Sequence, residues 1–177
     1  MRLFVAALLP GEVRQSLGEF TNSLKPNIDG VKWEKEEKLH ITLKFLGETD
    51  EQNAAKVSDI VGGLAQKYSP FRTSVKNIGG FPGLDNPRVL YIGLSPNEEL
   101  SAFQREIEAG LETLGFAREK RRFIPHVTIG RVRKRFGIKA PVPMPQKVGF
   151  EISSIGIIKS ELKPEGSVYS PLSVFTL

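Results

Sequence analysis

The chain contains one short pattern twice, and the spacing of the two copies constrains the fold more than any other feature of the sequence. The copies read HITL at residues 40–43 and HVTI at residues 126–129, each a histidine and a threonine two positions apart followed by an apolar residue. Both histidines of the chain lie in these copies, 86 residues apart in a chain of 177. Each copy lies in a strand-like run that follows a strand and a helix. The spacing predicts a duplication within a single domain, residues 1–177, with two similar lobes that face one another.

Hydrophobic periodicity predicts the strands and helices of both lobes. Three amphipathic helices are expected, over 13–24, over a segment that follows Thr49 and includes 57–64, and over 96–114 after a cap at Ser95. Strands are expected at residues 2–9, 30–34, 38–46, 71–79, 88–94, 126–132, 149–160 and 167–176.

Composition excludes several classes of site and of protein. The chain has no cysteine, which rules out disulfides and thiol chemistry. Two histidines without cysteines would need a carboxylate cluster to bind zinc, and no such cluster or nucleophile motif is evident, so we expect neither a metal nor a cofactor. No run of 18 apolar residues is present, and the first 15 residues are more typical of a strand than of a signal peptide. We therefore expect a cytoplasmic protein with no membrane partner.

The positive charge of the chain is concentrated around the second copy of the pattern. Residues 118–135 contain eight basic residues and one acidic residue, a net charge of +7, whereas the rest of the chain carries −2. A local field of this kind suits a polyanion such as nucleic acid, although a solvated basic face is the alternative.

The chemistry of the repeated pattern follows from strand geometry. Alternate side chains of a strand share a face, so His40 points the same way as Thr42, and His126 the same way as Thr128. If the two strands lie near a two-fold axis, two imidazoles and two hydroxyls meet in one small volume. With pKa values near roughly 6.5, one imidazole can act as general base and the other as general acid, while the hydroxyls donate to phosphoryl oxygens. This arrangement suits metal-free opening of a 2′,3′-cyclic phosphate, and the residues alone leave open which histidine is the acid.

The repeated pattern resembles the paired signature of the two-histidine phosphoesterases, and most closely of their RNA 2′,3′-cyclic phosphodiesterase branch, also called the 2′-5′ RNA ligase family. The resemblance covers nearly the whole chain, including the stretches RLFVAALLP, LHITLKFLGE, FPGLDNPRVLYIGL, FIPHVTIGR and SELKPEGSVYSPLSVFTL. It implies an α+β, bilobal fold in which two antiparallel sheets, related by a pseudo-two-fold duplication, face a central cleft, with helices on their outer faces.

The resemblance also implies roles for individual residues. His40 is expected to donate a proton to the leaving 3′ oxygen and His126 to accept one from water, which leaves a 2′-phosphate on the RNA. Arg131 matches an arginine with which the family holds phosphate, but strict strand alternation places it on the face opposite His126 unless the strand bends or bulges near Gly130. Reversible 2′-5′ RNA ligation is a further activity within the family.

Three other residues are candidates for contact with the substrate. Lys44 falls on the face of His40 and Thr42 by alternation, where it is either a substrate ligand or a solvated lysine at the end of the strand. Tyr91 and Phe81 can stack on a base, with core packing as the alternative.

The expected partners are RNA ends that carry a cyclic phosphate, including tRNA halves, and we expect a monomer. Two alternatives stay open. One is an RNA-end-binding module without turnover, and the other is a phosphodiesterase of the same superfamily that acts on small cyclic nucleotides or 2′-5′ oligoadenylates.

Overall fold

The structure, a computed structural model, describes residues 1–164 and 166–177 and has an α+β architecture. The helices described are α1 (Gly11–Leu24), α2 (Glu51–Ala65) and α3 (Glu98–Glu112), with short 3-10 helices η1 (Lys25–Asn27) and η2 (Glu36–Lys38). The strands described are β1 (Arg2–Leu8), β2 (Ile28–Trp33), β3 (His40–Glu48), β4 (Phe71–Phe81), β5 (Val89–Leu94), β6 (His126–Ile138), β7 (Gly149–Ile152), β8 (Ser154–Lys163) and β9 (Gly166–Thr176).

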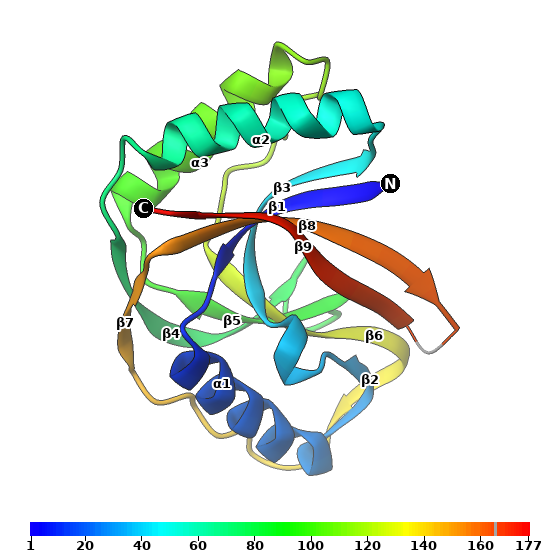
Figure 1. Cartoon of the computed structure of the whole chain (residues 1–177). Helices are drawn as coiled ribbons and strands as arrows, with labels where there is room; N and C mark the ends of the chain where they lie inside the picture. Colours follow the sequence, from blue (N-terminus) through cyan, green and yellow to red (C-terminus); the bar gives the residue numbers. More distant parts are fainter. Residues whose placement is uncertain (165) are drawn as a thin grey trace.

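The strands form two antiparallel lobes that are joined edge to edge. The order across the sheet is β7-β4-β5-β6-β3-β1-β8-β9, and β2 pairs with the far part of β6. The lobes meet at β3 and β6, where one residue pair, Ile41 with Val127, links them. The β8–β9 hairpin and the β2–β6 ribbon project to the same side of the molecule (Figure 1). The predicted α+β fold with two antiparallel lobes is therefore confirmed.

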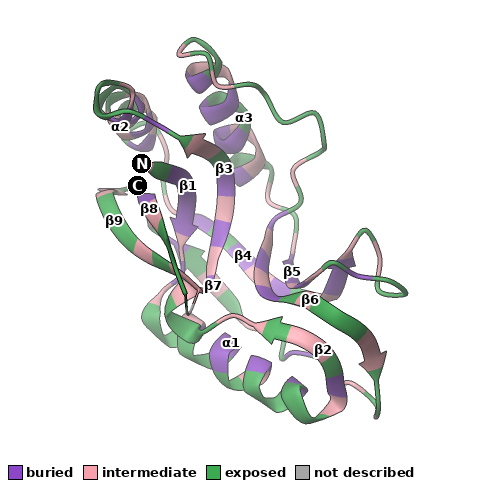
Figure 2. Ribbon diagram, turned by 90° about the vertical axis from the view of Figure 1, so that its right-hand side faces the viewer, coloured by how far each residue is buried: buried purple, intermediate pink, exposed green. Residues whose placement is uncertain are grey.

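The helices cover the outer faces of the lobes. Helices α2 and α3 lie side by side over the lobe that contains β3 and β9, and α1 lies at the opposite end of the molecule (Figure 1). Four apolar residues of the stripe predicted for α3 are fully buried: Leu100, Phe103, Ile107 and Leu111. The fifth, Leu114, follows the end of the helix and is partly buried. Figure 2 shows that the inner sides of α2 and α3 and much of β1 and β3 are buried. The core thus holds β3 and β6 rigidly in the middle of the sheet.

Some boundaries differ from the prediction. The side-chain caps of α2 and α3 are Asp50 and Asn97, each of which accepts a hydrogen bond from the backbone three residues on, instead of Thr49 and Ser95. The strand expected at 149–160 is two strands, β7 and β8. The short Asx side chains compete well with hydroxyls for the cap position, so the pattern alone does not decide between adjacent candidates.

Within the described residues, no helix has both the length and the apolar character needed to cross a membrane.

Candidate active site

The link between the two lobes passes through the centre of both His-x-Thr copies. Ile41 pairs with Val127, and both are fully buried. Because neighbouring side chains of a strand point to opposite faces, the four residues that flank this pair all point to the other face of the sheet. The register sets His40 across from Thr128 and Thr42 across from His126. The structure thus brings the four predicted residues together around one local two-fold axis.

His40 is fixed by hydrogen bonds through both ring nitrogens. Its Nδ1 donates to the carbonyl oxygen of Lys38 at 2.6 Å, since a carbonyl can only accept. The proton on Nδ1 leaves Nε2 as the reactive nitrogen, and Nε2 lies 3.0 Å from the hydroxyl oxygen of Thr42. The ring packs against Phe4, with centroids 4.8 Å apart, and meets Tyr169 edge-on at 5.7 Å.

His126 has a matching environment in the other lobe. Its Nδ1 donates to the carbonyl oxygen of Ile124 at 2.6 Å, again two residues earlier in the chain. Two aromatic rings pack against the imidazole, Phe81 at 5.0 Å and Tyr91 at 5.1 Å between centroids. Gly79 makes this packing possible, because a Cβ on Gly79 would collide with the Tyr91 ring. Each imidazole therefore has a fixed tautomer and two aromatic neighbours.

Burial lowers the pKa of both histidines from their ordinary value of 6.5. For His40, burial is the largest cause, opposed by the hydrogen bond to Lys38 and reinforced by the positive charges of His126 and Arg131. For His126, burial again lowers the pKa, and the hydrogen bond to Ile124 opposes it. Both imidazoles of the free protein therefore favour the neutral form at neutral pH. A bound anion would favour the protonated form of either one.

The bulge that Arg131 needs is present, at Ile129. Tyr91 of β5 pairs with Thr128, but Leu90 pairs with Gly130, so Ile129 is an extra residue on β6. Val89 pairs with Arg131, and Val89 and Tyr91 share a face of β5. Arg131 therefore points to the same face as Thr128 and His126. Its Nε lies 3.9 Å from a carboxylate oxygen of Glu34.

The expectation that Lys44 shares the face of His40 is wrong, because β3 has a bulge at the same place in the pattern. Ala6 pairs with Thr42 and Val5 with Lys44, so Leu43 is an extra residue, and Lys44 turns toward the helices. Its ammonium group lies 2.5 Å from a carboxylate oxygen of Glu108 on α3, and the two side chains are only 3% and 9% exposed. Lys44 is thus part of the protein interior and does not face the histidines.

Sequence reasoning missed several aromatic groups on this face. On β1, Leu8 pairs with His40, Ala6 with Thr42 and Phe4 with Phe45. These three residues of β1 share a face, so Phe45 lies on the same face as His40 and Thr42, where it is 66% exposed. It lies five residues after His40, just as Arg131 lies five after His126, so a comparison of the two copies would have found it. Tyr169 carries no such signal, because only the pairing of β8 with β9 brings it beside His40. The two aromatic residues predicted from the sequence as candidates, Phe81 and Tyr91, do lie on the histidine face rather than in the core.

The basic segment runs from the histidines along the β2–β6 ribbon. Four basic residues follow the second copy on β6. Of these four, only Arg131 has an ion-pair partner within the part of the chain that the structure describes. Lys32 of β2 pairs with Arg131 across the ribbon and so extends the positive charge on this face. The other three are exposed: Arg133, Lys134 and Arg135.

No group of three or more His, Cys, Asp or Glu side chains that could hold a metal ion occurs within residues 1–164 and 166–177.

Comparisons with known proteins agree with the duplicated site. A family model described as LigT like Phosphoesterase matches the chain twice, over residues 8–91 and 92–169, so that each match contains one copy of the pattern. A Methanocaldococcus jannaschii protein named RNA 2′,3′-cyclic phosphodiesterase is 36% identical over 175 residues, which is 96% of each chain. A Thermus thermophilus protein of the same name is 35% identical over 188 residues, which covers 100% of this chain and 90% of that protein.

Solved structures give the same result. The crystal structure of the Thermus thermophilus protein TT0787 has a TM-score of 0.89 and 31% identity, and the match covers 100% of this chain and 98% of that one. Escherichia coli LigT, solved with 3′-AMP, shares the fold, with a TM-score of 0.83 and 22% identity over 99% of this chain and 97% of that one. The chain therefore belongs to the LigT-like phosphoesterase family.

Proposed function

We propose that the protein is an RNA 2′,3′-cyclic phosphodiesterase that hydrolyses a terminal cyclic phosphate to a 2′-phosphate without a metal or other cofactor. The observation that carries the proposal is the pairing of Ile41 with Val127, which sets two histidines and two threonines on one face. The names of relatives at 35–36% identity over nearly the whole chain support the cyclic-phosphodiesterase activity.

In the proposed mechanism the two imidazoles act on opposite sides of the phosphorus. His126, whose pKa burial lowers, takes a proton from the attacking water. His40 gives a proton to the 3′ oxygen as the P–O3′ bond breaks, and the phosphate stays on the 2′ oxygen. The acid role of His40 follows from the family resemblance. Burial and the charge of Arg131 lower the pKa of His40, so the negative charge of the bound phosphate is needed to keep this imidazole protonated.

The remaining groups of the site stabilise the charge on the phosphate. Thr42 and Thr128 donate hydrogen bonds to the non-bridging oxygens, where negative charge increases in the transition state. Arg131 contributes its guanidinium group from the same face. The exposed ring of Phe45 offers a surface on which a base can stack.

The same groups can catalyse the joining of RNA ends. If a 5′-hydroxyl replaces water, His126 takes its proton and the product is a 2′-5′ phosphodiester. Because the steps are those of hydrolysis with a different nucleophile, this ligation is reversible.

RNA is favoured over a small cyclic nucleotide by the charge that lies beyond the histidines. The exposed basic residues of β6 extend well past the space that one nucleotide needs, and each phosphate that they neutralise adds salt-dependent affinity. An RNA-binding module without turnover is disfavoured, since binding alone does not require two imidazoles with matched hydrogen bonds.

The decisive experiment incubates a short RNA with a 2′,3′-cyclic phosphate end with the protein in EDTA and separates 2′- from 3′-phosphate products. The proposal expects complete conversion to the 2′-phosphate. A 3′-phosphate product would require the substrate to bind in the reverse orientation. Loss of activity in EDTA, restored by a divalent metal, would contradict the metal-free mechanism.

A further inference from the structure

A cavity of about 320 Å³ is lined in part by His40. It lies where the end of β1, the first turn of α1, η2 and the β8–β9 hairpin meet. Phe4, Tyr169 and Val174 contribute apolar or aromatic walls. Arg14 and Lys38 contribute positive charge, and Glu37 contributes one negative charge. The volume is within the range of about 300–1,000 Å³ that is typical of ligand pockets.

Arg14 lines this cavity and has one unsatisfied donor. Its Nε is buried and has no hydrogen-bond partner among the described residues. A buried donor without a partner is rare and costs free energy, so a shift of the Arg14 side chain that brought this N–H to an acceptor on a ligand in the cavity would be stabilised. No carboxylate within residues 1–164 and 166–177 lies within ion-pair distance of Arg14, and Glu37 of the cavity lining has Lys35 as its ion-pair partner, which leaves the charge of Arg14 available for an anion.

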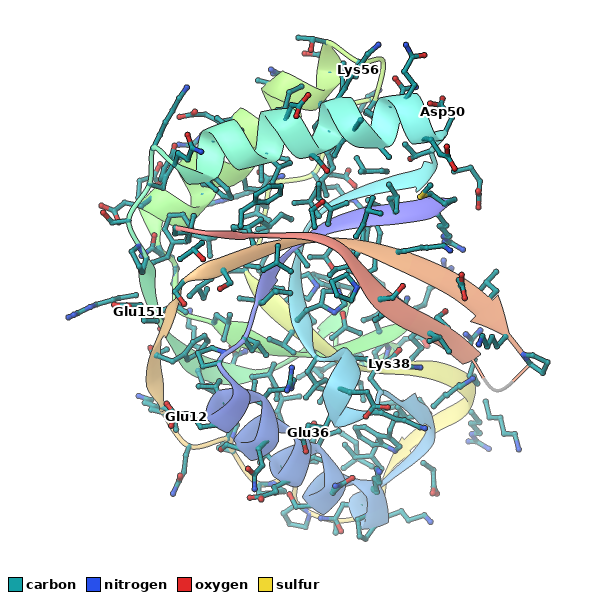
Figure 3. The ribbon with its side chains drawn as sticks, in the orientation of Figure 1. Glu12, Glu36, Lys38, Asp50, Lys56 and Glu151 are labelled. Atoms are coloured by element: carbon teal, nitrogen blue, oxygen red, sulfur yellow. The ribbon has the colours of Figure 1, made fainter. Side chains whose placement is uncertain are left out.

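Lys38 connects the cavity with the basic ribbon. Its ammonium group lies 5.9 Å from the centre of the Tyr169 ring, and in Figure 3 Lys38 lies on η2 close to β9. The ammonium groups of Lys38 and Lys32 are both near Gly166, and Lys32 pairs with Arg131 across the ribbon. Cationic side chains therefore run from the cavity, past His40, to β6. A chain with repeated negative charge fits such a row.

The chemistry of the ribose determines which part of an RNA reaches the cavity. In the proposed mechanism His40 protonates the 3′ oxygen, so the C3′ side of the terminal ribose faces His40. C3′ is bonded to C4′, which carries C5′ and the phosphate that joins the preceding nucleotide. The base is attached through C1′, on the C2′ side. The 5′ phosphate is therefore directed toward the cavity beside His40, and the terminal base away from it.

We propose that this cavity binds the penultimate nucleotide of the RNA, and that Arg14 holds the phosphate linking that nucleotide to the terminal ribose. The proposal rests on the phosphodiesterase function proposed above and specifies its substrate as RNA of two or more nucleotides. Arg14 and Lys38 bind the phosphate, while the apolar walls accept the nucleoside, whose size the cavity matches better than that of a phosphate alone.

The test compares three substrates: adenosine 2′,3′-cyclic phosphate, the same nucleotide with a 5′-phosphate, and the dinucleotide ApA with a terminal 2′,3′-cyclic phosphate. For the wild-type protein, kcat/KM should rise at each step, and by at least about tenfold from the first to the last. The Arg14→Gln variant should lose about tenfold of the gain from the added phosphate, since a tenfold change corresponds to about 1.4 kcal/mol, near the lower end for a hydrogen bond to a charged group. Arg105→Gln, which makes the same charge change on the outer helix α3, should leave the ratios unchanged.

A second variant keeps the test decisive if Arg14→Gln unfolds. Val174 lines the cavity from β9 and is 51% exposed, so Val174→Trp should fold and fill the space for the nucleoside. Val174→Trp should reduce the dinucleotide ratio, which is kcat/KM for the dinucleotide divided by kcat/KM for the 5′-phosphorylated nucleotide. It should leave the gain from the 5′-phosphate largely intact. Equal wild-type kcat/KM values for all three substrates would overturn the inference while the proposed function stands. An equal loss on all three substrates in Arg14→Gln, with the dinucleotide ratio intact in Val174→Trp, would also overturn it. No opening of any substrate would refute both.

Discussion

Replacing Lys44 by methionine should destabilise the protein strongly without weakening substrate binding. Lys44 forms a buried ion pair with Glu108, and its ammonium group also donates to the carbonyl oxygen of Ala117 at 2.8 Å. Glu108 in turn accepts from Gln104 and from the backbone N–H of Glu119. The network ties β3 and α3 to the loop that leads into the second copy of the pattern.

The size of the effect follows from the burial of the pair. Removal of one partner leaves the Glu108 carboxylate in the interior without its counter-charge, which costs about 3–5 kcal/mol of unfolding free energy. For a chain of this length, that loss corresponds to a fall in Tm of roughly 6–20 °C. Additional replacement of Glu108 by leucine removes the uncompensated charge, so the double variant should be more stable than Lys44→Met alone.

Urea unfolding of the wild type and the variants measures these free energies directly, and Lys56→Met, an exposed lysine on α2, provides the matched control. We expect the control to unfold within about 0.5 kcal/mol of the wild type. The KM of Lys44→Met for a cyclic-phosphate RNA should equal that of the wild type below its Tm. An unchanged unfolding free energy together with a raised KM would refute the placement of Lys44 by the bulge at Leu43.

Two further perturbations test the cleft and the ribbon. Arg131→Gln should lower kcat/KM by about 10- to 100-fold through loss of a charge-assisted contact with phosphate. The positive charge of Arg131 also lowers the pKa of His40, so the falling limb of the pH profile should move to higher pH in this variant. If this falling limb did not move, Arg131 and His40 would not interact. The second perturbation replaces three exposed residues of β6 by glutamine at once: Arg133, Lys134 and Arg135. The variant should raise KM more for RNA than for a cyclic mononucleotide and reduce the salt dependence of KM. Equal effects on both substrates would contradict RNA binding along β6.

The centre of the site could be predicted from the sequence because it depends only on strand alternation and duplication. His-x-Thr in a strand places both side chains on one face, whatever the rest of the fold does. The presence of two copies half a chain apart indicates that the strands are related by symmetry. The pairing of Ile41 with Val127 is the structural form of that prediction.

The errors and omissions around the centre have one main physical cause, the β-bulge that follows the threonine in each copy. A bulge inserts one residue and reverses the faces of all that follow, so alternation counted through it gives the wrong face. Gly130 signals a bulge before Arg131, whereas Lys44 itself occupies the equivalent position of the first copy, so no glycine signals the bulge there. Since the chain is duplicated, the same irregularity occurs twice, at Leu43 and at Ile129.

The cavity beside His40 could not be predicted from local patterns. Arg14 lies in an amphipathic helix, where an arginine is most often on the solvated face. Only the packing of α1, η2 and the β8–β9 hairpin around the end of β1 buries its Nε and places Arg14 and His40 in the lining of one cavity. Contacts of this kind join segments far apart in the chain and leave no periodic signal in any of them.

The most direct test of the two-histidine mechanism is the pH dependence of kcat/KM for a cyclic-phosphate RNA, measured for the wild type, His40→Ala and His126→Ala. The wild type should give a bell-shaped profile whose maximum lies on the acid side of 6.5, because burial lowers both pKa values. Each variant should lose about 10²–10⁴-fold in rate. His126→Ala should also lose the rising limb and His40→Ala the falling limb. Near wild-type rates in both variants, with folding intact, or loss of the opposite limb in each, would contradict the account.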